Sequence, residues 1–463
     1  MKGTDQGHPF GKEPVMLTLP SVAESLVMSL SVAFTQPTFR RILPLLVGAI
    51  LARGRHTVTA LLRAAGRLAP GHWSDYHRVF SRAAWSLWLP GLILARAALH
   101  WTDPAEPVLL PVDDTTAQHR GKRVYGKGCH HDAVRSTHSH IVWRWGHKWV
   151  VLSIAVKFPF TWRRWALPVL VALYRPEDLN RSEGRRHKTP AQLARQLAAV
   201  LIHWFPARKF VLLGDGGYAS HELAAFCHRH RRHIALISRC HPEVNLYDPP
   251  PVNRNRTGRP RLKGRKRPTP REAVARGRPQ RATVDWYGGG RRRVALLHGE
   301  GHWYKAGQGL VPIRWVHVHD VQGTHRDDWL YSTDPRLAPT QIVSWFTARW
   351  PIETTFQEVR AHLGFETTRQ RVAPSVLRTG PCLLGLFSVI CLIYAEHQRR
   401  HGGGPRRSAW YRKAEPTFSD AVATVRRLFW EKTVFQQSAH NDALKKVPRG
   451  LRLLLLDGLS HAA

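Results

Sequence analysis

An α/β fold with more than one domain is predicted by three features of the chain. Two short apolar runs, 108–112 and 209–213, have the length and composition of buried strands. Residues 338–364 repeat apolar and charged positions at steps of three and four, which predicts helix. Residues 281–297 and 311–321 alternate like strands. A chain of 463 residues exceeds one typical core, so about three domains are expected.

Each of the two apolar runs ends in acidic residues. Asp113 and Asp114 follow the first run, and Asp215 follows the second, before two glycines. A lone Asp in such a place more often caps a turn or a helix. Strands that deliver acids to the same sheet edge, however, commonly build a site there. Asp113 directly follows its strand and is the favoured first acid, but Asp114 fits the same Asp-x-Thr pattern and stays an alternative.

The helical pattern at 338–364 carries a charged stripe where an apolar one would be expected. Its members are Phe346, Arg349, Glu353, Phe356 and Arg360, which a helix would place on one side. A carboxylate between two guanidiniums suits a site that holds a cation and a phosphate together. The simpler interpretation is a surface helix with an i,i+4 Arg–Glu pair. Because proline lacks an N–H, the Pro at position 351 predicts a kink or a break into two helices.

The order strand-Asp, strand-Asp, helix-Glu identifies a family resemblance. The stripe reads Phe346-x2-Arg349-x3-Glu353-x6-Arg360, and the chain resembles the DDE-class cut-and-paste insertion-sequence transposases, whose signature is Tyr-x2-Arg-x3-Glu-x6-Lys. The similarity spans roughly residues 108–371. It implies an RNase H-like catalytic core with an inserted mostly-β subdomain, plus helical N-terminal and C-terminal regions.

Two positions depart from the family signature. Phe346 replaces Tyr and lacks the hydroxyl that could contact a phosphate. Arg360 replaces Lys, which keeps the positive charge and adds a planar fork suited to bidentate phosphate contact. The resemblance implies that Arg349 and Arg360 hold DNA phosphates beside the acids and that Phe346 lies against the same DNA.

The acids determine the expected chemistry. Carboxylates are hard oxygen ligands that suit Mg²⁺ or Mn²⁺, and two such ions about 4 Å apart can promote phosphodiester displacement. The resemblance implies that Asp113, Asp215 and Glu353 are catalytic, with Asp215 bridging the ions and Asp114 a further candidate ligand. It also implies hydrolysis at transposon ends, followed by attack of the freed 3′-hydroxyl on target DNA.

The charge of the chain indicates a polyanionic partner. Lys and Arg number 70 against 32 Asp and Glu, a formal net charge of +38. An Arg-rich proteome could account for part of this excess, but the basic residues are also clustered. Double-stranded DNA, both transposon ends and target, is therefore the expected partner, and its binding should weaken steeply with salt.

Cysteine usage and hydropathy indicate where the protein works. Five unpatterned cysteines indicate a reducing compartment without a disulfide framework. The N-terminal residues are polar, and the apolar runs 42–51 and 383–394 are too short to span a bilayer. We expect a cytoplasmic, bacterial protein, nucleoid-associated when DNA-bound, with no membrane partner.

Five segments are predicted from these patterns. Residues 1–105 form a separate helical unit that binds DNA ends, with a helical cap on the core as the alternative. Residues 106–237 and 331–380 form the two parts of the RNase H-like core. Residues 238–330 form the inserted basic and β subdomain. Residues 381–463 are helical, and the resemblance implies that they pair subunits, giving a homodimer in the DNA complex.

The insertion offers two candidate DNA contacts. One is a Pro/Gly-rich basic stretch, expected to be a flexible loop that DNA orders. Its candidate contacts are Arg259, Arg261, Lys263, Arg265, Lys266 and Arg267. The other is Trp303, which lies in a Gly-rich stretch and is the expected aromatic for stacking on an unpaired base. A place in the sheet core is the alternative for this tryptophan.

Two other functions stay open from the sequence. One is a metal-dependent DNA nuclease on the same core that performs no strand transfer. The other is an inactive, transposase-derived DNA-binding protein, which the intact set of three acids disfavours. A zinc site among Cys227, Cys240 and the histidines between them is disfavoured, because the spacing is unusual and the arginines between them would repel a cation.

Overall fold

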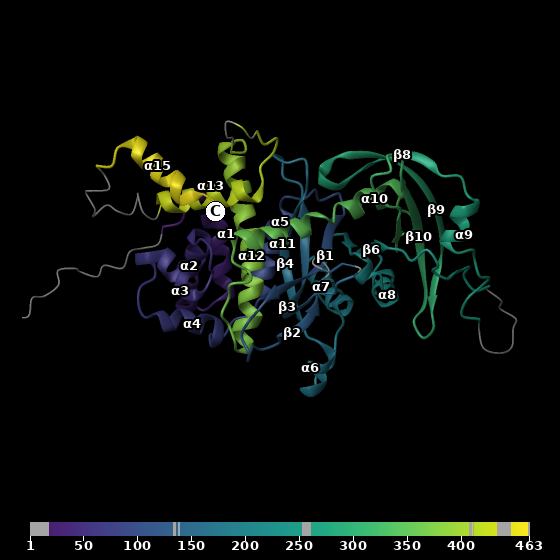
Figure 1. Ribbon diagram of the computed structural model, residues 1–463, viewed down its shortest axis with the longest axis horizontal. Coiled ribbons are helices and arrows are strands. Elements are labelled where there is room, and N and C mark those ends of the chain that lie inside the picture. The colour runs from purple at the N-terminus through teal and green to yellow at the C-terminus, as the bar shows by residue number, and fades with distance from the viewer. Residues whose placement is uncertain are drawn as a thin grey trace, which may run out of the picture.

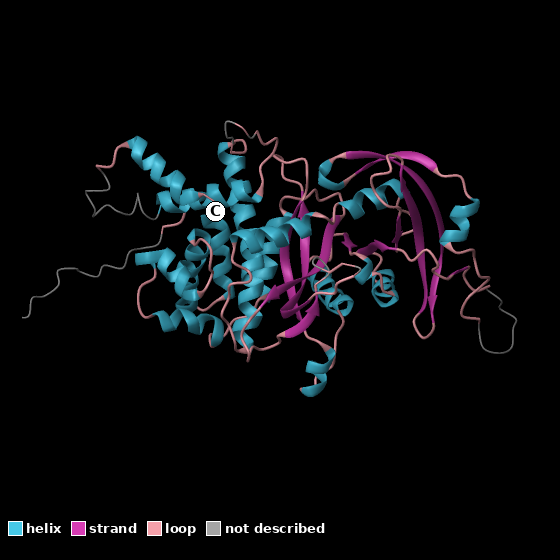
Figure 2. Ribbon diagram, viewed as in Figure 1, coloured by secondary structure: helices cyan, strands magenta, loops and turns pink. Residues whose placement is uncertain are grey.

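The computed structural model describes residues 18–132, 136–137, 139–251, 261–406, 410, 412–432 and 446–461. The molecule is elongated, with most of its helices at one end, a sheet in the middle and a β-rich part at the other end (Figure 1). Most helices gather at one end of the molecule, and the other end is mainly strands with a few helices beside them (Figure 2). This mixed architecture confirms the predicted fold class.

One mixed sheet runs through the centre of the molecule. Its first strands are β1 (Val108–Gln118), β2 (Gly128–His131), β3 (Trp143–Val156), β4 (Trp165–Tyr174), β5 (Phe210–Leu213) and β6 (Ile234–Arg239). β3 pairs antiparallel with both β1 and β4, whereas β5 runs parallel to β1 and to β6. The resulting order β4-β3-β1-β5-β6 is that of an RNase H-like core.

The insertion continues this sheet. Its strands are β7 (Leu246–Tyr247), β8 (Gln280–Asp285), β9 (Arg291–Lys305), β10 (Gly309–Asp320) and β11 (Asp328–Ser332), with helix α9 (Pro270–Arg276) before β8. β11 pairs antiparallel with β6, and β10 and β9 follow it across the sheet. The alternating segment 311–321 corresponds to β10, as the period-two pattern predicts, whereas the segment 281–297 is divided by a turn into β8 and the first part of β9.

The N-terminal helices cover the core and are not a separate unit. They are α1 (Ser21–Ser29), α2 (Gln36–Leu51), α3 (Val58–Ala65), α4 (Trp73–Ser81) and α5 (Trp88–Leu99). Their apolar faces share one hydrophobic core with β4 and with the C-terminal helices. The alternative of a helical cap is therefore the observed packing, and the predicted separation is wrong because the helix faces pack on distant parts of the chain.

The remaining helices surround the sheet. They are α6 (Glu177–Ser182), α7 (Pro190–Trp204), α8 (His221–Arg229), α10 (Pro339–Thr347), α11 (Pro351–His362), α12 (Ala373–His401), α13 (Phe418–Trp430) and α15 (Arg449–Ser460). α12 is apolar and long enough to cross a membrane, but most of its apolar stretch is buried inside the protein. It packs on β4, α1, α4, α5 and α13, and is a core helix.

The chain between β11 and α12 breaks where proline predicts. α10 ends at Thr347 and α11 begins at Pro351. The first turn of a helix accepts proline because the N–H groups there have no partner within the helix. Gly364 follows the end of α11 with φ of +57°, a conformation that glycine adopts without strain. The expected single stripe is therefore divided between two helices.

Candidate active site

Parallel pairing of β1 and β5 places two aspartates at the same edge of the sheet. Pro111 of β1 is opposite Leu213 of β5, the last pair in this register. Asp113 and Asp215 each lie two residues further along their segments. Asp215 lies in the turn after β5, and its charge acts on Asp113, so the parallel pairing of the two strands brings the two carboxyl groups near each other.

A tight turn after β5 orients Asp215. Its Oδ1 accepts a hydrogen bond of 2.9 Å from the backbone N–H of Gly217, and its carbonyl oxygen accepts one of 2.7 Å from Ser238 Oγ. A side chain at Gly214 would collide with Tyr218, since a Cβ there would lie 2.5 Å from the Tyr218 Cβ. The glycine thus permits the close turn that holds the acid in place.

Arg349 joins the third acid to the first. Its Nη1 lies 3.0 Å from Asp113 Oδ2, and its Nη2 lies 2.8 Å from Glu353 Oε1. The Arg349 side chain is 9% exposed. Burial lowers its pKa, but the charges of Asp113, Glu353 and Asp215 more than offset this effect, so the pKa is raised. The guanidinium therefore interacts electrostatically with all three acids.

The pKa of Asp113 is strongly raised. Burial raises its pKa to about 7, against the opposing charge of Arg349, and the charges of Asp215 and Asp114 raise it further. Carboxylates held together in a poorly solvated place resist full ionisation. Perturbed acids of this kind are typical of functional sites.

The neighbouring Asp114 has a different environment. Its Oδ2 lies 2.6 Å from Lys148 Nζ on β3. Burial raises the pKa of Asp114, and Lys148 opposes that effect. Asp113, in contrast, is the acid that Arg349 links to Glu353. The geometry thus favours Asp113 over Asp114 as the partner of the other two acids.

The donor set fits a hard divalent cation in its chemistry. Asp113, Asp215 and Glu353 supply only carboxylate oxygens, the ligands that Mg²⁺ and Mn²⁺ prefer. Within the described ranges, no three His, Cys, Asp or Glu side chains are spaced closely enough to hold a metal ion. Arg349 lies between two of the acids, so these residues could hold a cation only after the guanidinium shifts.

Other members of the predicted stripe have separate environments. Arg360 donates to Thr115 Oγ1 and to the Thr116 carbonyl of β1, which holds it beside the first acid's strand. Phe346 is 2% exposed and belongs to the second hydrophobic core, so the prediction that it contacts DNA is wrong. The helical period placed Phe346 and Arg349 on the same side of the segment, but it did not indicate that the phenylalanine points into the core.

Exposed and half-buried aromatic rings border the acids. Trp350, next to Arg349, is 45% exposed, and its ring centroid lies 5.8 Å from that of Tyr287. Tyr287 also stacks on His325, with ring centroids 6.0 Å apart. Burial is the main cause of the raised pKa of Tyr287, and Arg349 and Glu353 are among the charges that act on it. The sequence did not predict this group of rings, Trp350, Tyr287 and His325, which we call the aromatic wall, although Trp350 lies within the third-acid motif.

Trp303 has a different place from the one predicted. Its ring packs on Tyr331 and His221, with centroids 5.8 and 5.0 Å away, and its carbonyl contacts His221 Nε2. β9 inserts it between β7 and β10, so it contributes to the core. The alternative of a sheet-core role is the observed one, and the stacking prediction is wrong for this residue.

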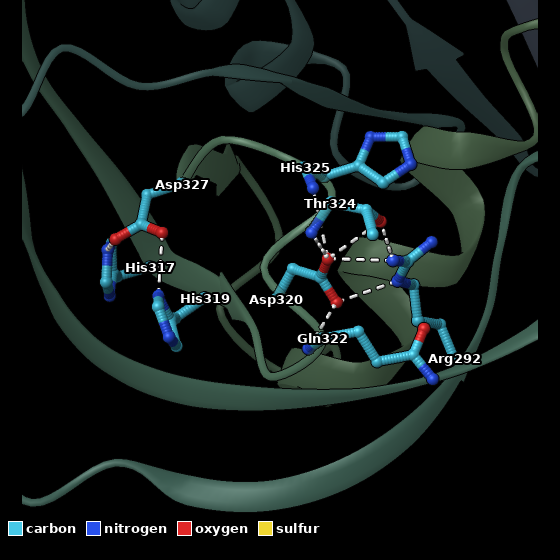
Figure 3. Close-up of polar contacts among 8 residues, drawn as sticks. All are labelled: Arg292, His317, His319, Asp320, Gln322, Thr324, His325 and Asp327. Atoms are coloured by element: carbon cyan, nitrogen blue, oxygen red, sulfur yellow. Dashed lines mark hydrogen bonds and ion pairs between the residues drawn. The ribbon is translucent and has the colours of Figure 1, made fainter.

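A buried carboxylate fixes the loop that carries His325. Asp320 accepts hydrogen bonds from Arg292 Nε at 2.7 Å and Nη2 at 2.8 Å, and from the backbone N–H of Thr324 and His325 (Figure 3). The side chain is 1% exposed. Arg292 is the main cause that holds its pKa well below the usual value. Nearby, Asp327 joins His317 and His319 (Figure 3).

The described part of the basic stretch is folded onto the insertion. Lys263 Nζ lies over the rings of Tyr247 and Tyr304, at 4.3 and 4.6 Å from their centroids. Arg267 contacts Asp248 and the Glu300 carbonyl. The expectation of a wholly flexible loop is therefore wrong for residues 261–267, where Lys263 and Arg267 have local partners, whereas Arg261, Arg265 and Lys266 are exposed. Arg259 lies outside the described residues.

Comparison with known proteins shows the family. A model described as DDE superfamily endonuclease matches residues 29–293, more than half of the chain, and the protein belongs to this family. The match includes both aspartate strands and ends before the helix with Glu353. The resemblance found in the sequence is confirmed at the level of this superfamily. No curated protein matches the chain.

One solved structure shows a weak likeness to the whole chain. It is the piggyBac transposase synaptic complex with hairpin DNA, with 11% sequence identity and a TM-score of 0.42. The alignment covers 96% of this chain and 82% of the other.

Proposed function

We propose that this protein is a DNA transposase that cuts transposon ends and joins the resulting 3′-hydroxyl to target DNA. The observation that carries the proposal is the single guanidinium of Arg349, which binds Asp113 and Glu353 at once, while the charge of Asp215 acts on both Arg349 and Asp113. The three acids come from a strand, a turn and a helix that are far apart in sequence. The family match supports DNA cleavage as the reaction type.

Each acid has a role that its surroundings favour. Asp113, Asp215 and Glu353 would hold Mg²⁺ or Mn²⁺, and Asp215, the acid on the turn, would bridge two ions. Such ions supply an activated attacking oxygen and a stabilised leaving oxygen in phosphodiester displacement. Arg349 neutralises the acids in the absence of a cation, and it is placed to bind the DNA phosphate once the acids release it.

The basic and aromatic residues around the acids would position DNA. Arg360, held against β1 by Thr115, would contact a phosphate on the strand side of the site. Trp350 and Tyr287 would stack on a base near the cut, the role first expected of Trp303. We propose double-stranded DNA as substrate, a homodimer as the DNA-bound form, and the bacterial cytoplasm as the location.

The experiment uses DNA that carries the sequences on both sides of the gene, where the proposal predicts inverted repeats. Purified protein is incubated with this DNA and Mg²⁺, and cleaved and joined products are separated by electrophoresis. Joined products are expected from wild-type protein. Cleavage without joining would favour the alternative of a nuclease, and binding without either product would favour an inactive DNA-binding descendant.

Neutral variants test the roles of the acids. Alanine at Asp215 or Glu353 should remove cleavage while DNA binding survives, because binding depends mainly on the basic residues. Mg²⁺-dependent nicking by the Glu353→Ala protein would remove Glu353 from the proposed centre.

A further inference from the structure

Two tryptophans near the start of β3 are exposed on one face of the sheet. Trp143 and Trp145 expose 61% and 58% of their surface. They lie two residues apart, so their side chains point to the same side, and they pair with His131 and Cys129 of β2. Trp143 also contacts the His131 ring, at 5.9 Å between centroids. A contiguous aromatic surface of this kind indicates a binding partner.

The same face carries the buried rings further along β3. His147 and Trp149 continue the alternation from Trp145, and both are buried. α12 covers this part of the strand, since a Cβ at Gly380 would lie 2.6 Å from the Trp149 ring. β3 extends past this cover, which leaves Trp145 and Trp143 without a partner from α12. The exposure is thus a consequence of strand length.

One cation lies over an exposed ring, and two arginines act on the histidine next to it. Lys127 Nζ lies 5.2 Å from the centroid of the Trp145 ring. The backbone N–H of His119 donates to the Trp145 carbonyl. Burial lowers the pKa of the His119 side chain, and the charges of Lys127, Arg369 and Arg371 lower it further. Both arginines are exposed. The nearby acid Asp132 is buried and pairs with Arg144. The surface is therefore aromatic and positively charged.

This surface lies in line with the acids on β1. Asp113 is opposite Val151, and the backbone N–H of His119, the residue that follows β1, donates to the Trp145 carbonyl. At about 3.3 Å per residue, Trp145 lies roughly 20 Å from Asp113 along the sheet. Arg360 contacts β1 at Thr115, between these two points. With a rise of about 3.4 Å per base pair, 20 Å corresponds to about six base pairs of DNA.

We propose that Trp143 and Trp145 form a second DNA contact, which stacks on bases of a locally opened duplex about six base pairs from the phosphate held at the acids. Positive charge attracts the backbone, and flat rings bind exposed bases without sequence preference. A fully paired duplex offers no base face to these rings. The inference rests on the proposed DNA substrate, but it concerns binding and does not require cleavage.

The test compares DNA binding by wild type and by a Trp143→Ala/Trp145→Ala variant. The probes are two fluorescent duplexes, one fully paired and one with a three-nucleotide bubble that contains 2-aminopurine. Wild type should prefer the bubble, and the variant should lose about tenfold in bubble affinity. Its affinity for paired DNA should change less than twofold, and the wild-type quenching of 2-aminopurine should disappear.

Matched variants make the result specific. Trp162→Ala, at a tryptophan 57% exposed on the β3–β4 connection, should behave as wild type. A Trp143→Phe/Trp145→Phe variant should restore most of the bubble preference. Asp215→Asn should also keep it, so that failure of the cleavage proposal is distinguishable from failure of this one.

Three results would overturn the inference. One is equal affinity of wild type for bubble and paired DNA. Another is an unchanged bubble preference in the double alanine variant. If light scattering shows in addition that this variant has a changed oligomeric state, the surface instead binds a second copy of the chain. The third concerns position: with the bubble three, six or nine base pairs from a 3′-hydroxyl end, affinity that is not greatest near six would contradict the placement.

Discussion

Two carboxylates, the half-buried Asp113 in the core and the buried Asp320 in the insertion, differ in their hydrogen-bond partners. Asp320 has a paired guanidinium and several backbone N–H donors, and its pKa is held well below the usual value. Asp113 shares Arg349 with Glu353 and faces two other acids, and burial raises its pKa to about 7. Asp320, with the larger set of donors, stabilises a loop, whereas Asp113, which accepts from Arg349 and from the backbone N–H of Asp114 but faces other acids, is the one suited to a cationic ligand.

The largest expected effect separates Asp113 from its neighbour in sequence. Asp113→Asn should lower the rate of DNA nicking by more than about 100-fold, beyond what loss of an outer-shell partner costs a metal site. Asp114→Asn should lower it less than about tenfold on the same scale, because Lys148 is its partner. Nicking rates with labelled DNA and Mg²⁺ measure both. The reverse ranking would make Asp114 the first acid.

Asp320→Asn should act on stability rather than chemistry. Removing one partner of a buried ion pair costs about 3–5 kcal/mol, so the insertion should unfold at markedly lower denaturant concentration. The control is Asp327→Asn, which removes an acid that is 45% exposed. Tryptophan fluorescence during urea unfolding follows both. Equal stability of the two variants would show that the bonds of Asp320 contribute little.

The pKa of Asp113 gives the expected pH dependence. In the folded protein this pKa is raised above the ordinary aspartate pKa of 3.8, so the folded protein binds an extra proton between about pH 4 and 7. This proton stabilises the fold at low pH, and the benefit is lost as pH rises through about 7. The ionised form is the metal ligand, so Mn²⁺ affinity should rise with pH, by up to about tenfold per unit, and level off above pH 7.

Calorimetric Mn²⁺ titrations from pH 5.5 to 8.5 test this pH profile. The Asp113→Asn protein should bind weakly with a flatter profile. A wild-type affinity that is constant across this range would contradict the raised pKa.

The smallest expected effect concerns the aromatic wall. Trp350→Ala should weaken binding of DNA with an unpaired end by about 1 kcal/mol, or about fivefold. Trp303→Phe should leave that affinity unchanged, because Trp303 packs inside the sheet. Fluorescence anisotropy with end-frayed and fully paired duplexes measures the difference. If Trp303→Phe weakened binding as much as Trp350→Ala, the proposal that Trp350 and not Trp303 stacks on an unpaired base would be contradicted.

Local patterns in the sequence predicted much of the fold and the set of acids. The apolar runs before Asp113 and Asp215 became β1 and β5, and Pro351 divided the helix as expected. These features depend on side-chain period and backbone chemistry, which short segments specify. The order of the acid motifs then indicated their convergence.

Features that depend on long-range packing could not be predicted in the same way. The inward direction of Phe346 and the position of Trp303 follow from which neighbours cover them. Arg349 was expected to contact phosphate, and its place between two acids follows only from how α11 packs against β1. The packing of the N-terminal helices on α12 likewise joins segments that are more than 270 residues apart.

The most direct test of the acid centre is iron-directed cleavage of the protein backbone. Fe²⁺ replaces Mg²⁺, and ascorbate with peroxide then generates radicals that cut the chain near the bound ion. We predict cuts close to Asp113, Asp215 and Glu353 together, which excess Mg²⁺ suppresses and Asp215→Asn removes. Cuts near only one of these residues, or the same cuts in the Asp215→Asn protein, would contradict a shared cation site.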